Sequence, residues 1–506
     1  MNTFTAPVLS YSLLSPILIV LGGALLGVLV EAFLSRSLRP IAQLSITLGT
    51  LVLAIVQLWR IRGASSLTAA MGSVAMDGAA ILLQASILII AILGVMLTAD
   101  REHFTVLAAS LPGSSEESQS LTSGEQLTEI YPLTLFAVAG MLLFPVANDL
   151  ITLFVALEML SLPLYLMAGL SRRRRLLSQE AALKYFLLGA FSSAFFLFGA
   201  AFLYGYSGSL SLAGIHDSVG SSNGNNVFLL IGIAFLSVGL LFKVSAVPFH
   251  SWTPDVYQGA PTPVTAFMAA ATKVAAFGAM LRIFYTAFAN AYWDWRPLIT
   301  VIAIITMLFG AIVAIAQRDI KRMLAYSSIA HAGFFLLGVI ALNKAGLDAS
   351  IFYLFVYGIA TIGAFGIVTL VQDSSGEVTD LNRWAGLGKR SPFAATLFAT
   401  FLLAFAGIPL TSGFIGKFSI FSAAYESGNR AVVVVGVLSS AIAAFFYIRV
   451  IVLMFFTDPI EDGTTVVIPS ILTRITVVVA FVVTLFLGVF PAPLLNFISS
   501  TAHFIR

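Results

Sequence analysis

Cysteine is absent from this sequence of 506 residues, and charge is scarce: Asp, Glu, Lys and Arg make up 10% of it. An ordinary soluble domain is about 25% charged. Without cysteine, the chain can form neither a disulfide nor a thiolate-ligated iron–sulfur cluster of its own. No phosphate loop, metal-ligand constellation or nucleotide fingerprint is present either. These absences exclude a soluble globular protein, and we expect no redox cofactor, metal or nucleic acid on this chain.

Long apolar runs take the place of the missing charge. Hydrophobic residues make up 59% of the chain, and runs of roughly 20 of them, each able to cross a hydrocarbon core of about 30 Å, recur from end to end. The pattern predicts an all-α polytopic protein of the lipid bilayer with about fourteen transmembrane helices. The expected spans are 13–33, 41–60, 75–99, 131–147, 150–170, 179–206, 227–251, 261–289, 297–316, 322–342, 349–371, 392–425, 430–456 and 470–495.

Lysine and arginine are distributed unevenly between the two sides of the predicted bundle. Loops after odd-numbered spans hold thirteen of them: Arg36, Arg39, Arg101, Arg172, Arg173, Arg174, Arg175, Arg318, Lys321, Arg322, Arg383, Lys389 and Arg390. The opposite side holds six: Arg60, Arg62, Arg296, Lys344, Arg430 and Arg506. Positively charged loops stay in the cytoplasm. We therefore expect a multi-pass protein with both termini on the outer side.

A faint internal repeat divides the predicted bundle. Asn148-Asp149 before one span parallels Arg318-Asp319 before another, and Val247-Pro248 parallels Ile408-Pro409. Each unit holds five spans, an odd number, so the second unit must enter the membrane from the opposite side. Two inverted repeats, each with a broken helix, are a transporter design. We divide the chain into three N-terminal spans with a cytoplasmic loop over about 100–130 (1–130), a first repeat (131–290), a second repeat (291–457) and a C-terminal span (458–506).

Pro248 and Pro409 mark the expected helix breaks. Proline removes a helix hydrogen bond and clashes with the preceding turn, so each helix should break or kink there. Freed carbonyls need water or polar partners, which indicates a hydrated cavity in the membrane. Lys243 comes five residues before the first break, and Lys417 follows the second, in a stretch with Gly413 and Gly416.

Glu158 is the only acid close to the middle of a span. Isolated charge inside a membrane is costly, so a buried basic partner is expected, and Lys243 is that partner by hypothesis. Two simpler interpretations stay open. Glu158 could be a protonated, hydrogen-bonded carboxylic acid, and Lys243 could extend its stem to the cytoplasmic interface.

Lys273 and His331 complete a set of titratable residues inside spans. Lys273 lies about twelve residues from either end of its helix, out of reach of both interfaces, and burial favours a neutral amine that has given up its proton. His331 shares a helix face with Ser327 and Ser328 and could relay protons, although a structural core histidine is nearly as good an interpretation. Lys184 is equally consistent with proton uptake and with a plain interface lysine. Near helix ends, three arginines are expected to be structural: Arg282, Arg449 and Arg474.

The broken-helix pairs and the Glu158/Lys243/Lys273/Lys417 set resemble the antiporter-like proton-pumping membrane subunits of respiratory complex I, which are similar to cation/proton antiporter subunits. The resemblance runs from about Tyr131 to Phe456. A narrower stretch, TPDVYQGAPTPVTAF over Thr253–Phe267, resembles the N-type subunits of NADH:quinone oxidoreductase. The M-type has a glutamate at the position of Lys417, and the L-type has a long lateral helix after its last spans.

The resemblance implies an H⁺-translocating role within an oxidoreductase complex, with proton transfer through Glu158, Lys243, Lys273, His331 and Lys417. FMN, iron–sulfur clusters and the quinone would belong to partner subunits. K-type and M-type subunits would be the neighbours, with the L-type further along, in the plasma membrane of a bacterium. Two alternatives stay open: a subunit of a multi-subunit Na⁺/H⁺ antiporter and a subunit of a membrane-bound hydrogenase.

Overall fold

The structure, a computed structural model, describes residues 9–64, 67–100, 115, 127–170, 175–221, 226–373, 376–459 and 464–505. Most of the predicted loop over 100–130 lies outside these residues, as do Arg101, Arg172–Arg174 and Arg506. In the described part of the chain, twelve helices are long and apolar enough to cross a membrane. Two shorter apolar helices, Ile130–Val146 and Pro392–Ala406, bring the total to fourteen. The predicted all-α fold of about fourteen spans is confirmed.

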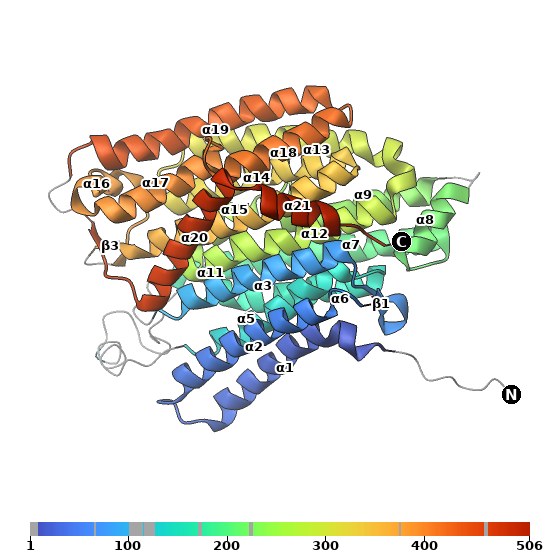
Figure 1. Ribbon diagram of the computed structural model, residues 1–506, viewed down its shortest axis with the longest axis horizontal. Helices are drawn as coiled ribbons and strands as arrows, with labels where there is room; N and C mark the ends of the chain where they lie inside the picture. Colours follow the sequence, from blue (N-terminus) through green and yellow to red (C-terminus); the bar gives the residue numbers. More distant parts are fainter. Residues whose placement is uncertain are drawn as a thin grey trace.

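The helices lie side by side along the horizontal axis of Figure 1, with α1 at the lower edge of the bundle and α19 at the upper edge. Asp77 begins α3 by accepting a hydrogen bond from the Ala80 amide (2.9 Å), as an N-cap residue should. The N-terminal elements are α1 (Tyr11–Phe33), α2 (Arg39–Ile61), β1 (Thr68–Ala69), η1 (Ala70–Gly72), β2 (Val74–Ala75), α3 (Gly78–Thr98), α5 (Ile130–Leu143) and η2 (Phe144–Val146).

The first repeat continues through the first broken helix. Its elements are α6 (Leu150–Ala168), α7 (Arg175–Ser207), α8 (Leu212–Ser221), α9 (Val227–Val244), α10 (Trp252–Gly259), α11 (Thr262–Phe267), the π-helical turn η3 (Met268–Thr272) and α12 (Lys273–Thr286). The sequence predicted one kinked helix over 227–251 with Lys243 deep inside it. Instead, α9 ends at Val244, before Pro248, because Ser245 is left-handed (φ 66°) and closes the helix. Lys243 therefore lies in the last turn of α9, beside the break.

The second repeat contains the second broken helix, α17 and α18. Its elements are η4 (Ala289–Ala291), α13 (Tyr292–Ile315), α14 (Ile320–Ala341), α15 (Lys344–Leu370), β3 (Val371–Asp373), β4 (Gly376–Glu377), η5 (Leu381–Trp384), α16 (Leu387–Arg390), α17 (Pro392–Ala406), α18 (Ser412–Glu426) and α19 (Arg430–Phe456). Pro409 lies within the break between α17 and α18, where it was predicted. Then follow β5 (Thr465–Val466), α20 (Ile471–Val489) and α21 (Ala492–Thr501).

Two aspartates reveal the inversion of the repeats. Asp149 caps α6 and Asp319 caps α14, each accepting hydrogen bonds from the backbone amides of the first helical turn. Each also forms an isolated antiparallel bridge to a later loop, Asp149 with Ser211 and Asp319 with Asp380. The first bridge lies next to α8 and the second next to β4, which are at opposite ends of the bundle in Figure 1. Equivalent caps at opposite ends are what an inverted repeat requires.

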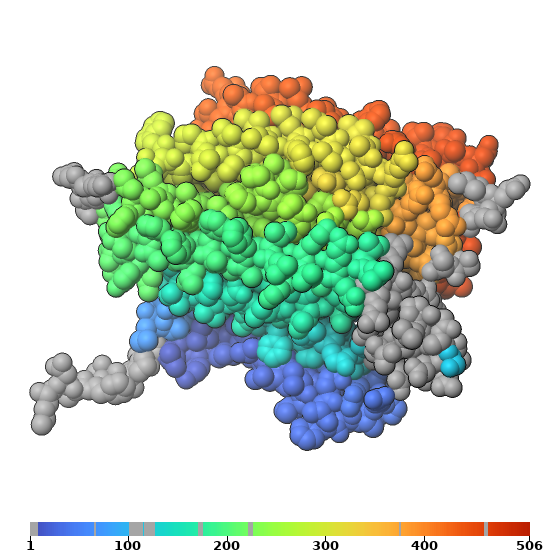
Figure 2. Space-filling view, turned by 180° about the vertical axis from the view of Figure 1, so that it is seen from behind, coloured from blue at the N-terminus to red at the C-terminus, as the bar shows by residue number. Residues whose placement is uncertain are grey.

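The central helices carry little lipid-facing surface. The most apolar 18-residue window is fully buried in Thr262–Thr286 and 94% buried in both α14 and α15. The outer helices differ: only 28% of the corresponding 18-residue window of α2 is buried, and 33% of that of α19. In Figure 2, the teal and green surface of α6 and α7 lies between blue α1–α2 and the yellow to red helices. Apolar side chains such as Phe191 and Phe198 are exposed on α7, as expected for contact with lipid.

Candidate functional site

Four of the five residues predicted to transfer protons are buried inside the bundle. The side chains of Lys243, Lys273, His331 and Lys417 are 1–4% exposed, and Glu158 is half-buried on α6. They come from both repeats and include a residue at each helix break. Lysines buried to this extent are rare in membrane spans and mark functional sites by default.

Lys243 is held by hydroxyl and aromatic groups. Its Nζ donates to the Ser161 Oγ of α6 (2.6 Å) and to the Tyr185 hydroxyl of α7 (3.4 Å), and it lies 5.7 and 5.3 Å from the ring centres of Tyr165 and Tyr185. Aromatic faces stabilise a nearby cation. This enclosed position differs from the alternative in which the lysine stem reaches out to the interface.

Glu158 lies one helical turn before Ser161 on α6, so the two residues share a face. Among the described residues, Glu158 forms no ion pair within 4 Å of Lys243, and its buried Oε1 accepts no hydrogen bond. The polar partner of Lys243 on α6 is therefore the Ser161 hydroxyl rather than the Glu158 carboxylate.

Lys273 begins α12, directly after the π-helical turn η3. Such turns are rare and often occur at functional sites, because they redirect the side chains that follow. Here, the Lys273 Nζ donates to the Ser328 carbonyl of α14 (2.5 Å). That contact joins the first repeat to the second, one turn before His331.

The His331 Nδ1 donates a hydrogen bond to the Ser327 carbonyl (2.9 Å). Its ring lies 5.6 Å from that of Phe334 and 5.8 Å from that of Phe405. Both phenylalanines also contact Lys417: the Lys417 Nζ lies 4.8 Å from the Phe334 ring centre and donates to the Phe405 carbonyl. His331 and Lys417 thus contact the same two phenylalanines.

Lys417 reaches back across the second break to the end of α17. Its Nζ donates to the carbonyls of Phe405 (2.7 Å) and Ala406 (3.1 Å) and to the Ser440 Oγ (2.9 Å). These carbonyls are freed by the end of the helix and carry its partial negative charge, so an ammonium is favoured there. Gly407 is left-handed (φ 79°), and a Cβ at this position would lie 2.8 Å from the Lys417 Cδ. Gly407 therefore permits the left-handed backbone turn and leaves room for the Lys417 side chain.

Lys184 is part of a separate, half-exposed ion-pair cluster. Its Nζ lies 2.7 Å from the Asp255 Oδ2, and Arg322 Nη1 of the second repeat lies 2.7 Å from the other oxygen, Oδ1. Burial by itself raises the pKa of the Asp255 carboxyl, but its hydrogen bonds with Lys184 and Arg322 outweigh this and lower the pKa. Asp255 is on α10, in the broken helix of the first repeat, so the cluster joins that helix to α14.

Arg282 forms the deepest ion pair in the described part of the chain. Its guanidinium contacts both carboxylate oxygens of Asp77 (3.0 and 2.9 Å), and both side chains are 0% exposed. Arg282 Nε also donates to the Pro145 carbonyl, and the Ile505 amide donates to Asp77. Because these groups tie α3, α12 and the C-terminal tail together, the contacts are those of a structural pair.

Sequence patterns missed Asp255 as a connector, Ser161 as the partner of Lys243, and Asp77 as the partner of Arg282. The only local signal for Asp255 was its place in the TPDVYQGAPTP stretch. Within the described residues, no group of three or more His, Asp or Glu side chains could hold a metal ion. The side chains that the interior of the bundle offers are amines, an imidazole and a carboxylate, which are groups that can take up and release protons.

Comparisons with known proteins agree with this geometry. The family described as "NADH:quinone oxidoreductase/Mrp antiporter, TM" matches residues 147–443. The NADH-quinone oxidoreductase subunit N of Rhodococcus opacus (strain B4) is 56% identical, over 100% of this chain and 98% of that protein. A chain of respiratory complex I from Thermus thermophilus superposes with a TM-score of 0.78 at 34% identity, covering 96% of this chain and 100% of that one. A chain of the Mrp complex from Dietzia sp. DQ12-45-1b has the same fold, with a TM-score of 0.79 at 22% identity, covering 97% of both chains.

The fold and the buried titratable residues define an antiporter-like membrane subunit. The chain belongs to the membrane-subunit family shared by NADH:quinone oxidoreductases and Mrp antiporters and, within it, to the subunit N proteins.

Proposed function

We propose that this chain carries protons across the membrane as a subunit of NADH:quinone oxidoreductase, driven by quinone reduction elsewhere in the complex. The observation that carries the proposal is the titratable row: Glu158, Lys243, Lys273, His331 and Lys417. A purely structural membrane subunit has no need of three buried lysines, because each charge costs free energy in the apolar interior.

Contacts between the members support a path along the row. Lys273 contacts the turn of α14 that leads to His331, and Phe334 and Phe405 connect His331 to Lys417. Buried polar atoms normally have a partner, or bind water where the protein supplies none. The Glu158 Oε1, Tyr353 hydroxyl and Thr361 Oγ1 have no hydrogen-bond partner in the described part of the chain. Water bound at such atoms would connect neighbouring members of the row.

Glu158 and Lys243 form the switch at the first end of the row. We take a separation of about 7 Å for the two charges. At an effective dielectric constant of about 20, they attract by roughly 2.4 kcal/mol, enough to change a protonation equilibrium more than tenfold. Moving Glu158 away from Lys243 favours release of the lysine proton toward Lys273.

Uptake occurs near Lys184, and release occurs near Lys417. The charge count of the loops supports a cytoplasmic position for Lys184, Asp255 and Arg322, with both termini on the outer side. Lys417 is nine residues before the end of α18 at Glu426, roughly 14 Å of helix from the outer end. A proton that reaches His331 adds a like charge beside Lys417 and favours discharge outward.

Partner subunits supply the redox chemistry. FMN, iron–sulfur clusters and the quinone site belong to them, and we place this chain between K-type and M-type neighbours in a bacterial plasma membrane, with the L-type further along. The test is co-purification: recovery of this chain with NADH-oxidising peripheral subunits would support the assignment over a Na⁺/H⁺ antiporter or a membrane-bound hydrogenase.

Glu158→Gln in the intact complex tests the proposal. We expect NADH-driven acidification of proteoliposomes to fall severalfold, because the neutral amide cannot attract Lys243. Glu426→Gln is the matched control, since Glu426 is an exposed glutamate at the end of α18. Unchanged pumping by fully assembled Glu158→Gln complex, with NADH oxidation intact, overturns the proposed role of the row.

A further inference from the structure

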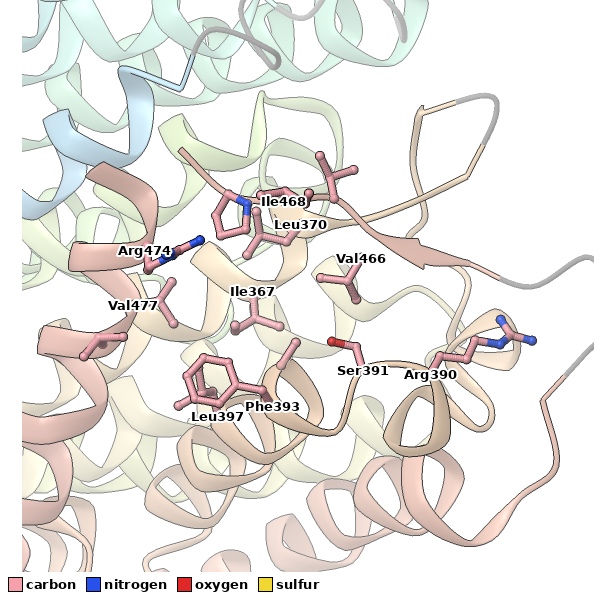
Figure 3. A pocket seen from close by; sticks show the side chains of 14 residues that line it. Ile367, Leu370, Arg390, Ser391, Phe393, Leu397, Val466, Ile468, Arg474 and Val477 are labelled. Carbon is pink, nitrogen blue, oxygen red and sulfur yellow. The ribbon is translucent and has the colours of Figure 1, made fainter. Parts of the chain in front are cut away.

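A pocket of about 310 Å³ opens on the surface of the bundle, separate from the titratable row (Figure 3). Its walls come from four segments: the end of α15, the start of α17, residues 466–469 and the start of α20. The pocket lies at the end of the bundle that carries α16 and the β3 strand in Figure 1. None of its lining residues belongs to the proposed proton path.

Hydrogen bonds hold the walls of the pocket in place. Strand β5 pairs with β3, and the Val467 amide donates to the Leu370 carbonyl (2.9 Å), which fixes the 466–469 wall. On α20, the buried Thr473 donates through Oγ1 to the Asp100 Oδ2 (2.7 Å), which fixes the first turn of that helix. The walls are therefore preformed, as they are in most small-molecule sites.

Most of the lining is apolar and faces the lipid phase. Phe393 is 66% exposed and Ile468 is 81% exposed, while Leu397 and Val477 lie deeper. On a soluble protein, such a surface would be unusual, but here it lies at the edge of a membrane span. Its natural contact is an acyl chain.

The rim is positively charged. Arg474 is exposed in the first turn of α20, and its guanidinium has no hydrogen-bond or ion-pair partner within the described chain. Arg390 borders the opposite side, where its Nη1 donates to the Thr464 carbonyl (3.1 Å). Figure 3 shows these two arginines at the two edges, with Ile367, Phe393 and Leu397 between them. No acidic residue is among the 14 that line the pocket.

We propose that this pocket binds an anionic glycerophospholipid. The phosphate lies against Arg474 at the start of α20, where the helix terminus also favours an anion, and an acyl chain lies along Phe393, Leu397 and Val477. Arg474, in a lining that includes no acidic residue, discriminates against a zwitterionic headgroup, whose ammonium it would repel. Apolar walls beside the arginine favour a lipid over free phosphate. Arg474 is then a ligand-binding residue rather than the structural arginine that its sequence position indicated.

Photo-crosslinking of the assembled complex tests this assignment. The complex is reconstituted into phosphatidylcholine vesicles that contain a diazirine-labelled phosphatidylglycerol, or diazirine-labelled phosphatidylcholine for comparison. Labelled peptides are identified by mass spectrometry. We expect the phosphatidylglycerol probe to label the 391–397 and 466–478 segments at least fivefold more than the phosphatidylcholine probe.

Three variants sharpen the result. Arg474→Gln should abolish most of the fivefold preference, and Val478→Trp should lower labelling by both probes by filling the pocket while both arginines remain. Arg318→Gln is the control, because Arg318 is an exposed arginine at the same end of the bundle but outside the pocket. It should leave labelling unchanged.

Three results would overturn the proposal. Equal labelling by both probes means an apolar crevice without headgroup selectivity. No labelling by either probe in the assembled complex means that a neighbouring subunit covers the pocket. Loss of the preference on addition of millimolar inorganic phosphate means that the arginines bind the free anion.

Discussion

Replacing Asp255 with asparagine removes one negative charge from between two cations that belong to different repeats. Asp255 lies on α10, next to the first helix break, and its two oxygens contact Lys184 and Arg322 at 2.7 Å each. Asparagine has nearly the same shape but leaves Arg322 without the carboxylate of Asp255 and Lys184 with that of Glu180 alone. The variant therefore tests whether the broken helix of the first repeat is coupled to α14 through this carboxylate.

The structure sets the scale of the effect. The Asp255 side chain is 30% exposed, so solvent screens both ion pairs, and exposed pairs are each worth only up to about 1 kcal/mol. Two such contacts give about 2 kcal/mol, or roughly a 30-fold change in any equilibrium that separates α10 from α14. We expect the number of protons pumped per NADH to fall by at least half while the complex stays assembled.

The assay measures the rate of proteoliposome acidification and divides it by the rate of NADH oxidation, which gives the number of protons pumped per NADH. Asp458→Asn is the matched control, because Asp458 is 91% exposed and its ion pair with Lys389 joins α16 to the segment directly after α19, without linking the two repeats. Lys184 and Arg322 lower the pKa of the Asp255 carboxyl in the folded protein. The stabilisation from the two ion pairs of Asp255 is therefore complete above about pH 4, and it is lost only as the pH falls through the lowered pKa. The deficit should therefore be constant between about pH 6 and 8. Normal pumping by Asp255→Asn refutes the coupling.

Three further substitutions follow from the contacts of the described chain. Lys417→Ala should weaken pumping severalfold in assembled complex; lost assembly instead favours an anchor to an adjoining subunit, and normal values for both eliminate the release role. Gly407→Ala should cost about 1–2 kcal/mol through its left-handed backbone and also displace Lys417, so its pumping should fall more than that of Gly428→Ala, where a Cβ meets open space. Asp77→Asn should lower thermal stability by about 3–5 kcal/mol, because it leaves the buried Arg282 charge uncompensated; an unchanged melting temperature of the complex would contradict that ion-pair argument.

The membrane spans and helix breaks could be predicted from the sequence, because each depends on residues that are close together in the chain. An apolar run of the right length has few alternatives in a bilayer, so the predicted ends lie within a few residues of the helix ends for most spans. Pro409 falls inside the second break for the same reason. At the first break the prediction was displaced, because the left-handed Ser245 ends α9 before Pro248 is reached.

The partners of the buried residues could not be predicted from the sequence, because contacts between distant segments leave no local pattern in it. Nothing near Lys243 indicates that it will donate to Ser161, 82 positions earlier, rather than contact Glu158 directly. Asp77 and Arg282 are 205 positions apart. The π-helical turn before Lys273 has no composition signal either, since its residues, Met268–Thr272, suit an ordinary α-helix.

Lys273→Arg is the most direct test of the proton path, because Lys273 is buried at the junction of the two repeats. Arginine keeps the positive charge and can still donate to the Ser328 carbonyl, but guanidinium does not release its proton. The measurement is the number of protons translocated per NADH by the assembled complex in proteoliposomes. If Lys273 transfers protons, the ratio falls well below that of the parent in both Lys273→Arg and Lys273→Ala. A parental ratio in Lys273→Arg would show that only the charge is needed, and the path through the buried row would be wrong.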